Sequence, residues 1–293
     1  MIVVDYNQTA ISNLMAEIGN RTDVEIQLPL LRHMIVNSIR GYKQKFGKEF
    51  GDIVIACDNQ HYWRRDYFPL YKAGRKKARE ESGFDWKIIF EALSQIRAEL
   101  DVFFPYKVVN VDGAEADDVI AVLAKWSQTN DTSNLLFEEP KPFLIVSGDH
   151  DFIQLHKYDN VKQYSPIQKK YVRSEVSPER YVFEHIIKGD KGDGIPNVLS
   201  ADDSIVNGVR QKPISSKKIE MWYKDYDALP TDTEFKRNYE RNRTLINFEC
   251  IPDQISESII NNYEEKPVKD KSKLLDFFVE HKMKNMLEVI EEF

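Results

Sequence analysis

The sequence has little that would suit a secreted or membrane protein. Among its 293 residues are only two cysteines, Cys57 and Cys250, which cannot form a disulfide framework or a four-cysteine zinc site. No stretch approaches the roughly 18 apolar residues that a membrane-spanning helix needs. The first residues read Met-Ile-Val-Val-Asp, without the basic segment and apolar stretch of a secretory signal. We therefore expect a cytoplasmic protein with no membrane partner.

The chain also lacks an excess of positive charge. It has 41 Lys and Arg against 48 Asp and Glu, a net charge of −7, which speaks against a simple nucleic-acid-binding protein with a basic face. Acidic residues gathered around a metal ion reverse the local field, however, so the distribution of charge matters more than its sum. At 42% hydrophobic residues, the chain can form roughly one to two domains with a real core.

Short segments rich in Val and Ile alternate with helical patterns. Four apolar stretches predict buried strands, at residues 2–4, 52–57, 106–111 and 142–146. Segments 161–164 and 171–172 predict a further strand and a hairpin-like edge. Apolar residues at helical spacing predict helices at 28–39, 86–100 and 115–126. This order predicts an α/β fold with a mostly parallel central sheet flanked by helices.

The predicted strands stop after about residue 175. Ser177 and Pro178 form a good helix start, with Ser as the cap and Pro in the first turn. We therefore place a boundary near residue 176, which divides the chain into an α/β domain (1–176) and a smaller helical domain (177–293).

Three predicted strands each run into an aspartate. These residues are Asp5, Asp58 and Asp149, and Asp151 follows two residues later. The carboxyl ends of parallel strands share one edge of a sheet, so these carboxylates would meet there. One strand-end Asp alone is more often a turn or cap residue, but the pattern recurs. Clustered carboxylates repel one another unless a cation lies among them, and oxygen ligands suit Mg²⁺, with Mn²⁺ close behind.

Acids also begin the helix after the third strand, where Glu115 and Asp117 stand two residues apart. Acidic residues favour a helix N-terminus in any case, so this segment alone leaves both readings open. On a regular helix the two side chains would point to different sides. Both can reach one site only if Glu115 lies at or before the helix start.

Asp149 and Asp151 could serve two cations, since neighbouring carboxylates can bridge or divide between them. Two ions roughly 4 Å apart can hold the attacking water and the leaving oxygen of a phosphodiester. We expect His150, between the two acids, to be structural or solvent-facing rather than a general base.

A basic segment follows the Asp58 strand. Residues 61–79 contain seven Lys or Arg against one Asp, with five aromatic residues interleaved. Lys72, Arg75, Lys76 and Arg79 have the spacing of one helix face. A solvated helix flank is the common alternative, but the segment leaves the sheet beside the acidic edge. This position favours contact with a phosphate backbone and stacking on bases.

The second half contains a tight glycine-rich turn at residues 189–196. Backbone amides in such turns bind phosphate, and Asp190 and Asp193 could face the acidic edge. Taken alone this signal is weak, because Gly and Asp are common in turns. Ser215 and Lys217 mark a second helix start, where phosphate binding and an ordinary capped helix are equally good readings.

Several blocks together resemble the 5′-nuclease family of flap endonucleases, 5′-exonuclease domains of bacterial DNA polymerases and phage 5′-exonucleases. They are Ala-Cys-Asp-Asn at 56–59, Tyr-Trp-Arg-Arg-Asp at 62–66, Glu-Ala-Asp-Asp at 115–118, Asp-His-Asp at 149–151 and Lys-Gly-Asp-Lys-Gly-Asp at 188–193. The resemblance runs over nearly the whole chain. It implies a PIN-like 5′-nuclease core with a basic helical arch at about 60–85, followed by a helix–three-turn–helix element.

The resemblance also implies residue roles. The acids divide into a first metal cluster of Asp5, Asp58, Glu115, Asp117 and Asp149 and a second of Asp151, Asp190 and Asp193, which hold two Mg²⁺ ions or Mn²⁺ as a substitute. Lys72 and Arg75 match residues that help place the scissile phosphate. Nucleic-acid contacts are expected from Arg64, Arg65, Lys76, Arg79, Gly192, Gly194, Ser215 and Lys217.

The implied activity is 5′-to-3′ exonuclease and flap cleavage on DNA and RNA–DNA duplexes, removing lagging-strand RNA primers in phage-type replication. Implied partners are a single-strand DNA-binding protein and a sliding clamp, and we expect a monomer. Two departures weaken the expected grip on duplex DNA and any potassium site: Gly194 stands where many relatives have Asn, and residues 198–212 intervene where many continue with a Gly-rich hairpin. Residues 274–278 could be a clamp-binding tail, but a core helix stripe is favoured.

Two other functions compete with a nuclease. A haloacid-dehalogenase-like phosphatase also uses a strand-end Asp, but it needs a second Asp two residues later, and that position is Asn7. A non-catalytic DNA-binding replication factor of the same fold would tolerate the loss of acids, and none of the family positions is lost.

Overall fold

The computed structural model describes residues 1–19, 21, 26–128, 140–267 and 269–293. Its centre is a six-stranded sheet with the order β3-β2-β1-β4-β5-β6. The strands are β1 (Ile2–Asp5), β2 (Ile53–Ala56), β3 (Lys107–Val109), β4 (Phe143–Val146), β5 (Val161–Ser165) and β6 (Lys170–Tyr171). Neighbouring strands are parallel except β6, which pairs antiparallel with β5. The predicted mostly parallel sheet with a hairpin edge is confirmed.

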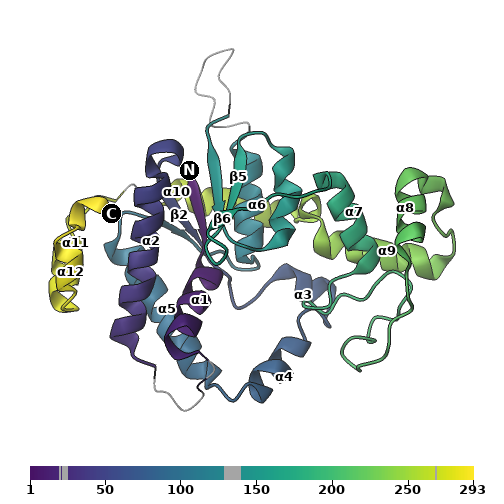
Figure 1. The fold of residues 1–293 in the computed structure, drawn as a ribbon, viewed down its shortest axis with the longest axis horizontal. Helices are drawn as coiled ribbons and strands as arrows, with labels where there is room; N and C mark the ends of the chain where they lie inside the picture. The colour runs from purple at the N-terminus through teal and green to yellow at the C-terminus, as the bar shows by residue number, and fades with distance from the viewer. Residues whose placement is uncertain (20, 22–25, 129–139, 268) are drawn as a thin grey trace.

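Helices cover both faces of the sheet (Figure 1). The helical elements of the first part of the chain are α1 (Tyr6–Ile18), α2 (Leu28–Phe50), α3 (Trp63–Tyr67), α4 (Gly74–Glu81), α5 (Trp86–Phe103), α6 (Ala116–Trp126) and the 3₁₀ segment η1 (His150–Lys157). The three helices predicted from periodicity are present as α2, α5 and α6, and α2 continues eleven residues beyond its expected end at 39.

Alternation along each strand divides the core into two layers. Ile2 and Val4 face a cluster formed with α1, α2 and α5, whereas Val3 between them faces a cluster formed with α6 and η1. Because both faces are covered, β2, β4 and β1 up to Asp5 are apolar throughout, whereas β5 nearer the sheet edge carries Lys162 and Gln163. This arrangement leaves the carboxyl edge of the sheet as the place where polar side chains gather.

The remaining helices are α7 (Pro178–Lys188), α8 (Ser216–Lys224), α9 (Thr233–Ile246), α10 (Asp253–Glu265), α11 (Leu274–Glu280) and α12 (Lys284–Leu287), with short 3₁₀ segments η2 (Tyr226–Ala228), η3 (Phe248–Cys250) and η4 (Ile290–Glu292). As expected, Ser177 caps α7, and its hydroxyl accepts from the Arg180 amide. α7, α8 and α9 share a small core of their own around Trp222.

The last part of the chain returns to the sheet, which the expected division at residue 176 did not anticipate. Ile259 of α10 packs into the α6 layer, and Leu274, Phe277 and Phe278 of α11 lie fully buried in the α2 and α5 layer. Residues 177–293 therefore do not form one separate hydrophobic unit. Burial of these three side chains confirms the helix stripe over a clamp-binding tail at 274–278. No helix among the described residues has the length and apolarity to cross a bilayer.

Candidate active site

Three neighbouring strands deliver carboxylates to one edge of the sheet. Asp5 ends β1 and pairs in register with Ala56, two residues before Asp58, while β4 runs on the other side of β1 toward Asp149. The Asp5 carboxylate accepts from the Gln8 amide at 3.0 Å and the Ser147 hydroxyl at 3.1 Å. Burial, with the charges of Asp58 and Asp149, raises the pKa of Asp5 to about 7.

Asp58 joins this edge to the start of α6. Its carboxylate accepts from the Ala116 amide at 2.7 Å and from the Asn7 side-chain amide at 2.5 Å. Burial raises the pKa of Asp58, and this effect outweighs the two hydrogen bonds, which lower it. Asn7, the residue that a haloacid-dehalogenase-like phosphatase would need as Asp, is here a donor that holds Asp58.

Glu115 lies at the start of α6, the position that it needs if it is to share one site with Asp117. Glu115 is the N-cap of α6, with extended backbone angles of φ −95 and ψ 164, and Asp117 lies in the first turn. Asp117 lines a narrow cleft together with Asp151, Asp190 and Asp193. Burial and the nearby charges of Asp149 and Glu115 raise the pKa of Asp117 well above its usual value.

Two cations hold Glu115 from either side. Lys72 Nζ lies 2.6 Å from Oε1, while Arg64 Nη1 at 2.9 Å and the Tyr71 hydroxyl at 3.1 Å donate to Oε2. Burial alone would raise the pKa of Glu115, but Lys72 and Arg64 outweigh it and lower that pKa. Glu115 is thus engaged by protein groups at both oxygens, a different environment from that of Asp5 and Asp117.

Lys72 is not on the predicted helix. α4 begins at Gly74, so Arg75, Lys76 and Arg79 lie on it but Lys72 precedes it. Lys72 has a left-handed backbone with φ 56, and its amide donates to the Asp193 carbonyl at 2.8 Å. A left-handed residue cannot continue a right-handed helix. The kink turns Lys72 inward to Glu115 instead of leaving it on a solvated stripe.

Arg64 corrects another expectation. Instead of facing nucleic acid, its side chain is 3% exposed and pairs with Glu115 at 2.9 Å and Asp118 at 2.8 Å. Nε donates to the Leu245 carbonyl at 2.9 Å. Arg64 therefore ties the start of α6 to the end of α9 and is not available at the surface. Arg65, the next residue, is exposed and lies over the Tyr62 ring at 4.8 Å.

The second group of acids surrounds a histidine that the sequence analysis did not single out. His185 Nδ1 lies 3.2 Å from Asp151, and Nε2 lies 3.3 Å from Asp190. Burial lowers the pKa of His185, but the two carboxylates outweigh it and raise that pKa to about 10. One ligand atom from each of the three residues lies within 4.8 Å of the others. The available signal was the position of His185 in the last turn of α7, directly before the glycine-rich turn.

The glycine-rich turn uses its amide groups inside the protein. Gly192 and Asp193 amides donate to the Asp190 carboxylate, and the Gly194 amide donates to the Lys191 carbonyl. Gly194 is buried with φ 74, and a side-chain carbon there would lie 3.0 Å from the Leu70 carbonyl. The expected phosphate contacts of Gly192 and Gly194 are therefore not supported: the turn holds Asp190 and packs on the segment that carries Lys72.

A buried glutamine supports the strand-end turn before Asp149. Gln163 on β5 is 1% exposed, and its Nε2 donates to the carbonyls of Ser147 at 2.9 Å and Asp149 at 2.6 Å. His156 Nε2 lies 3.0 Å from Gln163 Oε1 and fixes the orientation of the amide. Gln163 thus sets the backbone from which the Asp149 side chain projects.

The donor set fits divalent cations. The pKa of Asp5, Asp58, Asp117 and Asp149 is raised in each case, which marks negative charge crowded without enough compensation. Oxygen ligands of this kind suit hard ions such as Mg²⁺. A cation among them would relieve the repulsion that raises these pKa values.

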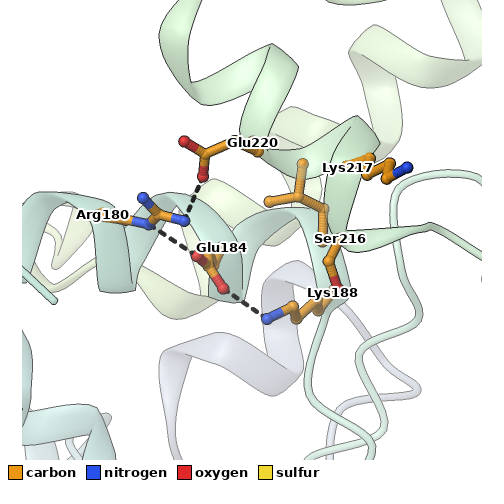
Figure 2. A pocket seen from close by; sticks show the side chains of 7 residues that line it. Arg180, Glu184, Lys188, Ser216, Lys217 and Glu220 are labelled. Carbon is orange, nitrogen blue, oxygen red and sulfur yellow. Dashed lines mark hydrogen bonds and ion pairs between the residues drawn. The ribbon is translucent and has the colours of Figure 1, made fainter. Parts of the chain in front are cut away.

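The other expected nucleic-acid contacts lie at the surface. Lys76 of α4 is exposed, and Ser215 caps α8, accepting from the Lys218 amide at 3.3 Å. Beside this cap lies a cavity of about 390 Å³ between α7 and α8. Figure 2 shows ion pairs in it between Arg180 and Glu184 and between Arg180 and Glu220, with Lys217 pointing away from them. Lys217 is exposed and takes no part in these two ion pairs.

The family model described as the N-terminal resolvase-like domain of 5′-3′ exonucleases matches residues 22–185, and the model of the T4 RNase H C-terminal domain matches residues 176–293. Ribonuclease H of enterobacteria phage T4 is 36% identical over 302 residues, covering 99% of this chain and 95% of that protein. The flap endonuclease Xni of Shewanella sediminis is 30% identical over 139 residues, 46% of this chain and 49% of its own length.

Solved structures share the fold. The D15 flap endonuclease of bacteriophage T5, in a complex with DNA and metal ions, superposes with a TM-score of 0.64 at 17% identity over 90% of this chain and 99% of that chain. D15 crystallised with metal ions superposes with a TM-score of 0.61 at 17% identity over 89% of this chain and 98% of that chain. The two family models and the full-length relative show that this chain belongs to the 5′-3′ exonuclease family and is a nuclease, a hydrolase of phosphodiester bonds.

Proposed function

We propose that this protein is a Mg²⁺-dependent 5′-to-3′ exonuclease and flap endonuclease that removes lagging-strand RNA primers from RNA–DNA and DNA duplexes in phage-type replication. One observation carries the proposal: strand-end carboxylates, the acids of the glycine-rich turn and the cations Lys72 and Arg75 converge on one edge of the sheet. The likeness to phage T4 ribonuclease H over nearly the whole chain supports the substrate and the 5′ polarity.

Two groups of acids would hold the metal ions. The first is Asp5, Asp58, Asp117 and Asp149, with Glu115 beside them, and the second is Asp151, Asp190 and Asp193. When bound, two ions would supply an activated water and stabilise the leaving 3′ oxygen. Glu115 joins the first group as a ligand only if Lys72 releases Oε1, and otherwise it holds Lys72 in place.

Lys72 and Arg75 act on the phosphate as fixed positive charges. Lys72 reaches Glu115 and lies 3.5 Å from Asp193, while Arg75 lies 2.5 Å from the same Asp193. Burial lowers the pKa of Lys72, but Asp193 and Glu115 more than offset it and raise that pKa above its usual value. Lys72 therefore stays protonated at neutral pH and neutralises phosphate charge instead of serving as a general base.

Duplex contacts are proposed for Ser215 and Lys217 at the start of α8 and for Arg65, Lys76 and Arg79 near the site. Association with a single-strand DNA-binding protein and a sliding clamp stays a prediction, as do the monomeric state and the cytoplasmic location.

The two rival functions are not favoured. Asn7 is engaged with Asp58 where a phosphatase needs Asp, and a non-catalytic factor would not need to keep the acids of both groups.

The test uses a 5′-labelled flap substrate and an RNA–DNA duplex, each incubated with Mg²⁺ or with EDTA. We expect short labelled products only with Mg²⁺, and none from the Asp149→Asn/Asp151→Asn variant. Asp159→Asn/Asp276→Asn is the matched control, because both acids are exposed and outside the cleft. The proposal fails if wild-type protein shows no metal-dependent cleavage, and the site assignment fails if the first variant cuts normally.

A further inference from the structure

We propose that His185 is itself a metal ligand, so that the second group of acids holds its ion through a nitrogen as well as through oxygens. As a result, this site prefers Mn²⁺, or another transition ion such as Co²⁺, to Mg²⁺. The proposal rests on the proposed nuclease function and specifies the ion at one of its two metal sites. It adds to that site a residue that the sequence pattern did not assign.

The packing of α7 against η1 brings His185 to the second group of acids. Asp151 lies in the first turn of η1, and His185 Nδ1 lies 3.2 Å from its Oδ1. The imidazole is only 15% exposed. The Tyr181 ring, one turn earlier on α7, lies 5.8 Å from the imidazole between centroids, in an edge-on arrangement. His185 is therefore held in place beside the cleft that Asp151, Asp190 and Asp193 line.

The two ring nitrogens of His185 have different partners. Nε2 lies 3.3 Å from Asp190 Oδ2, in hydrogen-bonding geometry. Asp190 is fixed in turn, because its Oδ1 accepts from the Asp193 amide at 3.0 Å. Metal-binding histidines commonly donate one ring nitrogen to a carboxylate, which orients the ring and leaves the lone pair on the other nitrogen. Asp190 supplies such a carboxylate, so Nδ1 is the nitrogen that faces the ion.

Nδ1 is also the nitrogen that lacks a partner. It is buried and makes no hydrogen bond with any residue that the structure describes, although Asp151 Oδ1 is only 3.2 Å away. A buried polar atom without a partner is unfavourable, and a cation between Nδ1 and Oδ1 serves both atoms. Adjacent ligands of an octahedral ion with bonds of about 2.1 Å lie about 3.0 Å apart, close to this separation. The neighbouring carboxylates also favour a proton on the ring, and a cation that binds Nδ1 replaces that proton.

A nitrogen ligand changes which ion the site prefers. The first group, Asp5, Asp58, Asp117 and Asp149, offers carboxylate oxygens, which suit Mg²⁺. Imidazole nitrogen favours transition ions, and Co²⁺ generally binds a given site more tightly than Mn²⁺. The two sites therefore differ in selectivity: Mg²⁺ displaces a transition ion readily at the first group but not at the second.

Electron spin echo envelope modulation of bound Mn²⁺ detects a coordinated nitrogen directly and needs no turnover. Wild-type protein with enough Mn²⁺ for both sites should show modulation from ¹⁴N, and labelling histidine with ¹⁵N should change its pattern. His185→Gln should lose this modulation. His150→Gln is the matched control, because His150 is exposed and stands between Asp149 and Asp151 in the sequence. This control should keep the modulation.

A Mg²⁺ titration of the Mn²⁺-loaded protein measures the selectivity, since released Mn²⁺ gives a sharp EPR signal. In wild type, Mg²⁺ should release part of the Mn²⁺ first and the rest only at a concentration at least about 10-fold higher, the smallest change expected when a metal site gains or loses a supporting group. In His185→Gln, all the Mn²⁺ should leave at the lower concentration. His150→Gln should keep both steps.

The ligand role of His185 is overturned if wild type shows no nitrogen modulation, a result that does not depend on the folding of any variant. It is also overturned if the modulation persists in His185→Gln, and His185 would then only pair with the two carboxylates. Release of all the Mn²⁺ from wild type in one step would overturn the selectivity. Failure of the proposed function would look different, because wild type would then bind Mn²⁺ through nitrogen without cutting the flap substrate in either ion. Circular dichroism in EDTA shows whether His185→Gln is folded.

Discussion

Arg64 and Arg65 are neighbours in the sequence with opposite environments, and substituting each with alanine separates a buried role from a surface one. Arg64 is 3% exposed and lies between Glu115, also 3% exposed, and Asp118, which is fully buried. Arg64→Ala removes the guanidinium and leaves two buried carboxylates with less compensation. It also frees the Leu245 carbonyl from its hydrogen bond with Nε.

The loss follows from the cost of an unpaired buried charge. Breaking a buried ion pair by removing one partner destabilises a protein by about 3–5 kcal/mol. Each kcal/mol lowers the melting temperature of a domain of this size by roughly 2–4 °C, so Arg64→Ala should melt about 10 °C below wild type. Arg65→Ala should stay within about 0.5 kcal/mol, because an exposed substitution seldom changes stability further. It should instead reduce the salt dependence of DNA binding by about one phosphate contact.

The assay is thermal unfolding in EDTA together with DNA binding in Ca²⁺ at several salt concentrations, for wild type and both variants. Arg64→Met, which keeps most of the volume without the charge, tests whether the loss is electrostatic rather than a cavity. A buried role for Arg64 is excluded if Arg64→Ala melts like wild type while its DNA affinity falls with a reduced salt slope. That result would indicate that Arg64 contacts nucleic acid at the surface, as expected from the sequence.

Three further predictions concern the site and its supports. The raised pKa of Asp5, about 7, means that the folded chain holds its proton more tightly than the unfolded chain. The contribution of protonated Asp5 to stability is therefore full below pH 4 and is lost as the pH rises to 7. In EDTA, the melting temperature of Asp5→Asn should thus rise relative to that of wild type between pH 4 and 7. A constant difference between the two melting temperatures would contradict this. Gln163→Met should weaken Mn²⁺ binding about 10- to 100-fold, because the turn before Asp149 loses its donors, and unchanged affinity by calorimetry would exclude this supporting role. Gly189→Ala should unfold at a lower urea concentration than Gly208→Ala. Both glycines have positive φ, but only at Gly189 would the new carbon lie 2.3 Å from a carbonyl oxygen. Equal losses of stability in the two variants would exclude this steric explanation.

Local pattern predicted the sheet and its acidic edge because both depend on short-range sequence. A run such as Ile2-Val3-Val4 followed by Asp5 predicts both a buried strand and a carboxylate at its end. The position of Glu115 at the cap of α6 was predicted only as a condition, since a cap depends on backbone angles that the sequence leaves open.

Tertiary contacts decided the features that the sequence did not reveal. Periodicity grouped Lys72 with the α4 cations, but its pairing with Glu115 and the docking of the 193–194 turn impose a left-handed backbone there. Arg64 looked like a surface cation within a basic run, but the acids at the start of α6 and the end of α9 bury it. His185 carries no motif in its own segment, because its role depends on Asp151, which is distant in the chain, as well as on Asp190 in the neighbouring turn.

Anomalous diffraction from crystals grown with Mn²⁺ would locate the metal sites of this protein directly. We predict manganese at the carboxyl edge of the sheet, with one ion among Asp5, Asp58, Asp117 and Asp149 and a second near Asp151, Asp190 and Asp193. Peaks only outside this edge, or none at a Mn²⁺ concentration that supports cleavage, would contradict it.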